Sequence, residues 1–165
     1  MGGIAKRLET KVQGLNKYLE TLKELDLVGR DVPITEKNPH KSKKGLYRIK
    51  DNFFRFWFRF IFPNMSHVEL GNYELVLENI RQNFGMFCSL VYANVAMEIL
   101  QYHMRKGLVG INFTSFGRWW SKDAEIDLVA IDTHSRNILV GECKWTNQPV
   151  SYEELKKLKS MALLL

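Results

Sequence analysis

Three charged residues stand in two segments that otherwise look like apolar strands. Residues 117–145 read GRWWSKDAEIDLVAIDTHSRNILVGECKW, which predicts two strands joined by a polar turn. Asp127 lies in the first strand, and Glu142 and Lys144 lie in the second. Since residues two apart on a strand point to the same face, Glu142 and Lys144 share a face and Cys143 points to the other. If the strands pair, Asp127 comes close to both, and two carboxylates with a lysine suit a divalent cation and the water it activates.

The same three residues also fit a purely structural role. Lys144 paired with Glu142 or with Asp127 would form an ion pair at one end of the sheet. The residue types do not choose between an ion pair and a metal site.

The chain that positions these residues has 165 residues, enough for one sizeable core or two small ones. The composition is typical of a globular protein, and no signal peptide or uninterrupted apolar run of membrane-spanning length is present. The apolar run at 53–62 is interrupted by Arg55 and Arg59. Because the apolar runs are too short or interrupted, no membrane partner is expected. Cys88 and Cys143 show neither metal-ligand spacing nor a disulfide framework, so a reducing cytoplasm is expected.

The net charge of +6 is concentrated near the N-terminus. Residues 1–62 carry 14 Lys and Arg against 7 Asp and Glu, a net +7, whereas residues 63–165 carry 10 against 11, a net −1. A basic N-terminal third indicates nucleic-acid contact, although a solvated basic surface has the same composition.

The N-terminal third has the pattern of a helix-turn-helix followed by a wing. Helices are predicted at 4–9 and 12–28, and strands at 28–34 and 45–50 enclose the basic loop TEKNPHKSKK. Exposed polar residues of the second helix and lysines of the loop could contact DNA, as could the arginine beside Trp119 and Trp120 in the motif stretch. These candidate DNA contacts are Lys11, Gln13, Asn16, Lys17, Lys41, Lys43, Lys44 and Arg118. The alternatives are an ordinary solvated helix face and a mobile polar loop.

Two further expectations concern the same region. A winged helix normally has another helix ahead of the turn, so the chain is expected to be a piece of a longer protein, or a remnant of one. The segment 51–63 is apolar all round except at its two arginines, which predicts a buried helix that connects the wing to the next domain.

The rest of the chain predicts an α/β domain. A long helix is expected from about Tyr73 to His103, then a strand within 107–120, the two motif strands, and a helix that Ser151 caps. This order predicts a mixed sheet flanked by helices, with a final strand missing beyond the C-terminus. Glu98 lies at the edge of an apolar stripe on the long helix, where a solvated role is the commoner one.

The segment EIDLVAID with ILVGECKW resembles the PD-(D/E)XK, or restriction-endonuclease-like, core, in which Asp127 matches the motif aspartate and Glu142-Cys143-Lys144 matches E-x-K. Nearly the whole chain is similar to the C-terminal region of archaeal ATPases of the AAA/STAND-like type. There, a winged helix and a nuclease-like domain follow the ATPase domain. The stretches ITEKNPHKSKKGLYRIKDNFFRFWFRFIFPN and GRWW…EIDLVA…GECKW carry this likeness. No G-x-x-x-x-G-K-[ST] is present, so nucleotide binding does not transfer.

The resemblance implies a partial winged helix at 1–62 and a PD-(D/E)XK nuclease-like domain at 63–165 that is incomplete at its C-terminus. The implied catalytic residues are Asp127, Glu142, Lys144 and Glu98, and the implied ligands of Mg²⁺ or Mn²⁺ are Asp127 and Glu142. The related ATPases place a glutamate after an aromatic residue of the first core helix, where this chain has Tyr92-Ala93. Glu98 could replace it, but five residues along a helix is about 140° around it.

Three functions therefore compete. The first is metal-dependent hydrolysis of phosphodiester bonds in DNA. The second is an inactive DNA-binding and regulatory module of an archaeal ATPase system, and the third is a domain that docks an ATPase domain or subunit. A homo-oligomer is compatible with all three. Trp119 and Trp120 could stack on bases near the site or pack between strand and helix.

Overall fold

The computed structural model describes residues 2–165, which divide into two compact units. One unit comprises residues 2–32 and 40–80, and the other comprises Pro33–Pro39 and Arg81–Leu165. The structure is a mixed α/β protein with a small antiparallel sheet and several helices. The predicted division at residues 62 and 63 stays a prediction, since the helix that follows contributes to both units.

The first unit begins with two short helices and a hairpin. Helix α1 (Gly2–Arg7) packs on α2 (Val12–Glu24), and β1 (Val28–Asp31) pairs antiparallel with β2 (Leu46–Ile49). A small core of Ala5, Leu15 and Leu19 holds the helices, with Ile4 and Tyr47 packed against it. The 3-10 turn η1 (Pro39–Lys41) lies in the loop between the strands. The expected helix–turn–helix–strand–loop–strand order is present.

The segment after the hairpin differs from the expected buried helix. Helix α3 (Asn52–Phe56), capped by the Asp51 carboxylate, continues as the π-helical turn η2 (Trp57–Ile61), the 3-10 turn η3 (Phe62–Asn64) and α4 (Met65–Glu69). Only Phe60 of residues 51–63 is buried, whereas Phe53 and Phe62 are largely exposed. A wider π turn rotates the residues after it, and Pro63 supplies no backbone N–H, so no regular helix continues here.

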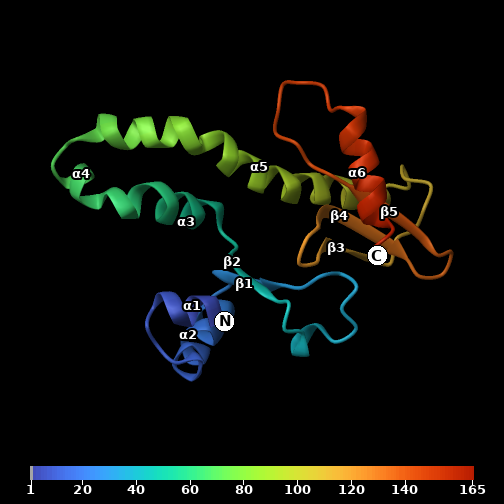
Figure 1. The fold of residues 1–165 in the computed structure, drawn as a ribbon, viewed down its shortest axis with the longest axis horizontal. Helices are drawn as coiled ribbons and strands as arrows, with labels where there is room; N and C mark the ends of the chain where they lie inside the picture. The colour runs from blue at the N-terminus through green and yellow to red at the C-terminus, as the bar shows by residue number, and fades with distance from the viewer. Residues whose placement is uncertain (1) are drawn as a thin grey trace. The chain divides into compact units, whose positions relative to one another are not determined.

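Helix α5 (Tyr73–Arg105) confirms the predicted long helix, and the chain reverses direction between α4 and α5 (Figure 1). By length and composition alone, α5 could cross a membrane. Its apolar residues do not form one uninterrupted run, because charged residues such as Glu78, Arg81 and Glu98 are spread along the helix. One such helix is weak support for a membrane span.

The second unit is built on a three-stranded sheet of order β3-β4-β5 (Figure 1). The strands are β3 (Ser115–Trp120), β4 (Glu125–Asp132) and β5 (Asn137–Gly141), and both pairs are antiparallel. The sequence predicts a mixed sheet, but the described strands are all antiparallel to their neighbours. The short connection between β4 and β5 can only join antiparallel strands. Ile126 and Val129 are fully buried at its centre.

Helix α6 (Tyr152–Ala162) packs on β4 and β5 and covers one face of the sheet. Leu158 and Met161 of α6 join the core around Ile126. Ser151 caps α6 by accepting a hydrogen bond from the Glu154 N–H, as the sequence predicts. Residues 33–39 belong to this unit, where the Ile34 N–H donates to the Arg118 carbonyl at the edge of β3.

Candidate functional site

A β-bulge in β4 separates Asp127 from the core of the sheet. Between the pairs Gly117↔Val129 and Trp119↔Ile126, β4 has one residue more than β3, so Asp127 and Leu128 together oppose Arg118. Ile126 and Val129 are three apart, which in a regular strand would put them on opposite faces, yet both lie in one core cluster. The extra residue reconciles the two positions, and bulges of this kind redirect a side chain next to functional sites. Asp127 is accordingly half-buried between two buried neighbours, Ile126 and Leu128.

The Asp127 carboxylate fixes the start of the segment that carries the other two motif residues. β5 ends at Gly141, earlier than predicted, and the chain then leaves the ladder. The Cys143 N–H donates to Asp127 Oδ2 over 3.0 Å, so the side chain of Asp127 replaces a backbone acceptor. This bond keeps Glu142 beside Asp127 although no ladder pairing holds them.

Asp127 and Glu142 line the same cavity of about 200 Å³. Arg118 and Glu125 from β3 and β4 line it as well, together with Ser89 of α5. The cavity therefore combines carboxylates, which bind cations, with a guanidinium, which binds phosphate oxygens. This combination suits a cation bridged to a phosphate group.

Lys144 is held by two carboxylates. Its Nζ lies 2.9 Å from Glu142 Oε1 and 3.5 Å from Glu154 Oε2 of α6. The hydrogen bond with Glu142 is the main cause that raises the pKa of Lys144. Burial opposes the rise, and the charges of Glu142 and Glu154 add to it. The ion pair considered from the sequence is thus present, with Glu142 as the partner.

The carboxylates are arranged too loosely to form a complete protein cage for a metal. Among residues 2–165, no three His, Cys, Asp or Glu side chains lie close enough together to hold an ion. The Asp127–Cys143 bond engages one oxygen of Asp127, and Lys144 engages one oxygen of Glu142, so each carboxylate has a second oxygen to offer. Mg²⁺ commonly binds through one or two carboxylates, with waters and phosphate oxygens completing its shell.

Cys143 also lines this cavity, and its surroundings disfavour the thiolate. Burial raises its pKa, and the negative charges of Asp127 and Glu142 raise it further, while Arg118 acts weakly in the opposite direction. A thiol in such surroundings is a poor nucleophile, since the thiolate is the reactive form. Cys143 thus contributes backbone atoms to the site and no thiolate chemistry.

The structure does not bring Glu98 to the other candidates. Glu98 is exposed on α5 and does not line the cavity of Asp127, while Ala93 is buried at 3% exposure. Sequence reasoning missed Glu125, which lines the cavity, and Glu154, which reaches Lys144. Glu125 precedes Asp127 by two residues on the same strand. The spacing that places Glu142 and Lys144 on one face could therefore have identified Glu125 as a neighbour of Asp127. No sequence signal marks Glu154, since a first-turn glutamate is ordinary.

The candidate DNA contacts fall in two places. The seven residues of α2 and the loop between β1 and β2 are all exposed: Lys11, Gln13, Asn16, Lys17, Lys41, Lys43 and Lys44. Arg118 is half-buried in β3 and lies in the cavity with Asp127 and Glu142. Trp119 is buried in the sheet core, which is the packing role considered from the sequence, and Trp120 is half-buried.

Comparison with known proteins identifies relatives without an assigned activity. The family model DUF234, described as archaeal and bacterial proteins of unknown function, matches residues 57–158. The uncharacterized protein MJECL04 of Methanocaldococcus jannaschii is 39% identical over 145 residues, which cover 88% of this chain. The chain spans about a third (32%) of the length of that relative. No solved structure matches the chain. Because the family match covers more than half of the chain, the protein belongs to the DUF234 family.

Proposed function

We propose that the second unit is a metal-dependent DNA nuclease domain of the PD-(D/E)XK type, with a restriction-endonuclease-like arrangement of its sheet. The observation that carries the proposal is that Asp127 and Glu142, from the motif strands, line one cavity with Arg118. The bulge in β4 supports it, because it turns Asp127 away from the core that the neighbouring residues form.

A divalent cation, Mg²⁺ or Mn²⁺, fits the residues present. Asp127 and Glu142 would hold it, and the Cys143 carbonyl is a candidate third ligand because its own N–H is fixed to Asp127. The ion would polarise a phosphate oxygen and lower the pKa of a bound water. Two carboxylates suffice for an ion that also binds the substrate phosphate.

The protein's own side chains would orient the phosphate and stabilise developing charge. Arg118 lies in the cavity with the carboxylates and can hold a phosphate oxygen through its planar group of donors. Lys144 can position the attacking water and stabilise negative charge in the transition state. To do so, it has to give up part of its ion pair with Glu142 or Glu154. A raised pKa keeps Lys144 charged near neutral pH, so it would act as a cation and not as a base.

The first unit would bind DNA through its partial winged helix, and the whole would act in the cytoplasm with an ATPase domain or subunit as its partner. The seven exposed polar residues on α2 and on the loop after β1 support this role. Such contacts are electrostatic, so replacing Lys41, Lys43 and Lys44 by alanine should weaken binding. It should reduce the slope of log affinity against log salt by up to about 3.

A second candidate is a DNA-binding and regulatory module without catalysis. The buried Ala93 supports it, because a glutamate is expected there from the resemblance, and so does Lys144, which is occupied by two carboxylates. In this case the motif residues would stabilise the end of the sheet without touching substrate.

Cleavage assays with charge-neutral variants of matched shape separate the two functions. Labelled single-stranded, duplex and branched DNA would be incubated with Mg²⁺, Mn²⁺ or EDTA. The native chain would be compared with Asp127→Asn, Glu142→Gln and Lys144→Met. Nuclease action predicts metal-dependent cleavage that falls by about 100-fold or more in each variant.

The matched control is Glu153→Gln, an exposed glutamate on α6 that pairs only with Lys156 among the described contacts. It should cleave like the native chain. A folded native chain that binds DNA but cleaves no substrate with either metal would favour the regulatory module and overturn the nuclease proposal.

A further inference from the structure

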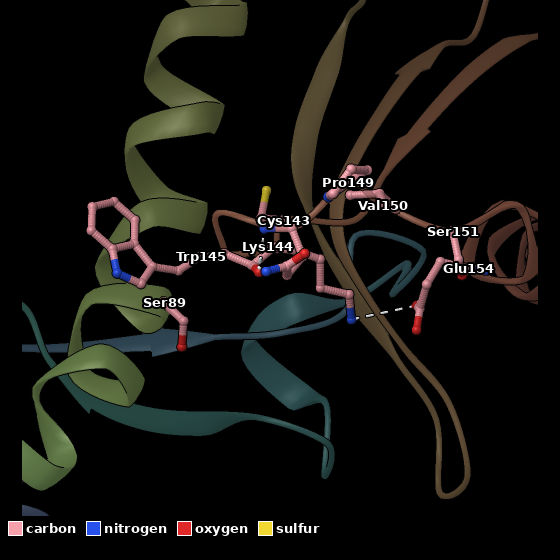
Figure 2. Close-up of a pocket in the computed structure, with 10 residues that line it drawn as sticks. Ser89, Cys143, Lys144, Trp145, Pro149, Val150, Ser151 and Glu154 are labelled. Atoms are coloured by element: carbon pink, nitrogen blue, oxygen red, sulfur yellow. Dashed lines mark hydrogen bonds and ion pairs between the residues drawn. The ribbon is translucent and has the colours of Figure 1, made fainter.

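A second and larger cavity of about 530 Å³ lies beside Lys144. It is formed mainly by the segment between β5 and α6, with Ser89 of α5 on one side and Ser151 and Glu154 of α6 on the other (Figure 2). Its volume falls in the range of about 300–1,000 Å³ that is typical of pockets for small ligands. It shares Cys143 and Lys144 with the proposed catalytic site, whereas Asp127 and Glu142 do not line it.

The walls of the cavity suit a neutral ring system. Trp145 lines it and is 56% exposed, and the Trp145 ring meets that of Tyr92 edge to face with centroids 5.6 Å apart. An indole that is so exposed has an uncovered surface available for stacking. Thr146, Gln148 and Ser151 add hydroxyl and amide groups that can bond to the edge of a base.

The charge of the cavity argues against a phosphate. Lys144 and Glu154 both line it and are paired with one another, so their charges cancel (Figure 2). The N-terminus of α6 carries Glu153 and Glu154 in its first turn, which would repel an anion there. A base without formal charge meets no such opposition.

We propose that this cavity binds an unpaired nucleobase of single-stranded DNA, stacked on Trp145. The proposal rests on the nuclease function above and gives that site its substrate class, a strand with at least one unpaired base next to the bond that is cut. Sequence order links the two sites, because Lys144 contacts Glu142 and the next residue, Trp145, lines the base cavity. Duplex DNA keeps its bases stacked and cannot fill the cavity without unstacking.

The test measures binding without cleavage. Affinities for a thymidine oligonucleotide and for a duplex of equal length would be measured with Ca²⁺ or EDTA, for the native chain, Trp145→Ala and Trp145→Phe. Stacking is worth about 1–3 kcal/mol per base, so Trp145→Ala should lose about 5- to 150-fold in affinity for the single strand. Its affinity for the duplex should not change, and Trp145→Phe should retain most of the single-strand affinity.

Tyr152→Ala is the matched control, because Tyr152 is an exposed aromatic residue of α6 (66%) outside the cavity lining. It should bind both substrates like the native chain. Unchanged single-strand binding by Trp145→Ala, or equal losses for both substrates, would overturn the base site.

The outcome is independent of the nuclease test. A chain that never cleaves but loses single-strand binding selectively in Trp145→Ala would have the base site without nuclease action. Cleavage that needs Asp127 and Glu142, with binding indifferent to Trp145, would leave a nuclease without the base site.

Discussion

The two hairpins of this protein are stabilised in different ways. In the β4–β5 hairpin, Ile126, Val129 and Ala130 of β4 have no exposed surface and α6 covers one face. In the strands β1 and β2 no residue is buried, although Pro33 in the loop between them is. Polar contacts hold that hairpin instead: Arg48 pairs with Asp31, and the Arg30 guanidinium donates to the Ser42 carbonyl across the loop.

This difference matches the work each hairpin is proposed to do. Carboxylates that hold a metal must keep fixed positions, and a buried strand supplies that rigidity for Asp127. Lysines that contact a DNA backbone need charge and reach more than exact placement, so Lys41, Lys43 and Lys44 can lie on an exposed loop. Apolar burial should therefore dominate the stability of the second unit, and hydrogen bonds that of the first hairpin.

The largest effect should come from the centre of the sheet. Ile126→Ala removes buried methyl groups and leaves a cavity, which should lower the free energy of unfolding by about 2–5 kcal/mol. The control Ile138→Ala, at a β5 position that is 50% exposed, should cost less than about 1 kcal/mol.

Chemical denaturation combined with amide hydrogen exchange would measure this effect for each unit. We expect amides of β3–β5 to lose protection in Ile126→Ala while those of β1 and β2 keep theirs. Equal loss in both hairpins would show that the units unfold cooperatively, and the contrast between them would then fail.

Much of the fold could be predicted because local patterns decide it. The long helix, the two motif strands, the turn at 132–137 and the Ser151 cap follow from periodicity, turn residues and capping chemistry. The bulge at Asp127 could not be predicted, since it depends on the register with β3 and not on β4 alone. The irregular helical segment at 57–64 could not be predicted either, because an apolar pattern does not reveal which helical turns will widen or tighten.

The candidate site was predictable to the same extent. Asp127, Glu142 and Lys144 stand out as charges in apolar strands, and the structure brings them together. Glu154 contacts Lys144, ten residues before it, only because the chain after β5 turns back and α6 packs on the sheet. Glu98 is a candidate only because it lies on the helix where the resemblance expects a glutamate. In the structure its side chain is exposed.

The next effect concerns the helix that carries Glu154. Ser151→Ala removes the acceptor for the Glu154 N–H, at 3.4 Å, and should destabilise the second unit by about 1 kcal/mol. Ser160→Ala, which removes an exposed hydroxyl from the same helix, is the control and should have a smaller effect. The midpoints of denaturant unfolding would compare the two, and equal shifts would contradict a capping role.

A comparable effect is expected from the loop of the first hairpin. A Cβ at Gly45 would overlap the Arg30 guanidinium, which would have to move and leave the Ser42 carbonyl. Loss of that bond should cost about 0.5–1.5 kcal/mol, whereas Gly3→Ala, where a Cβ meets no neighbour within 4 Å, should be neutral or stabilising. Exchange of the β1 and β2 amides would report the difference. If Gly45→Ala left it unchanged, polar contacts would not be what holds this hairpin.

The smallest effect tests whether charge matters within the apolar hairpin as well. The hydroxyl of Ser135 donates to Asp132 and lowers the pKa of Asp132 below its ordinary value of 3.8, against the opposing effect of burial and with help from two backbone N–H groups. A lowered pKa adds stability that is present above 3.8 and is lost as the pH falls through the folded-state value. Asp132→Asn, which has no charge to lose, should therefore be less stable than the native chain near neutral pH. Melting temperatures measured from about pH 7 down to about pH 2.5 should converge at the acid end. A difference in melting temperature that persists at the acid end would mean that the amide disturbs the turn itself. The stability of the β4–β5 hairpin would then come from apolar packing and turn geometry, and the charge of Asp132 would contribute nothing.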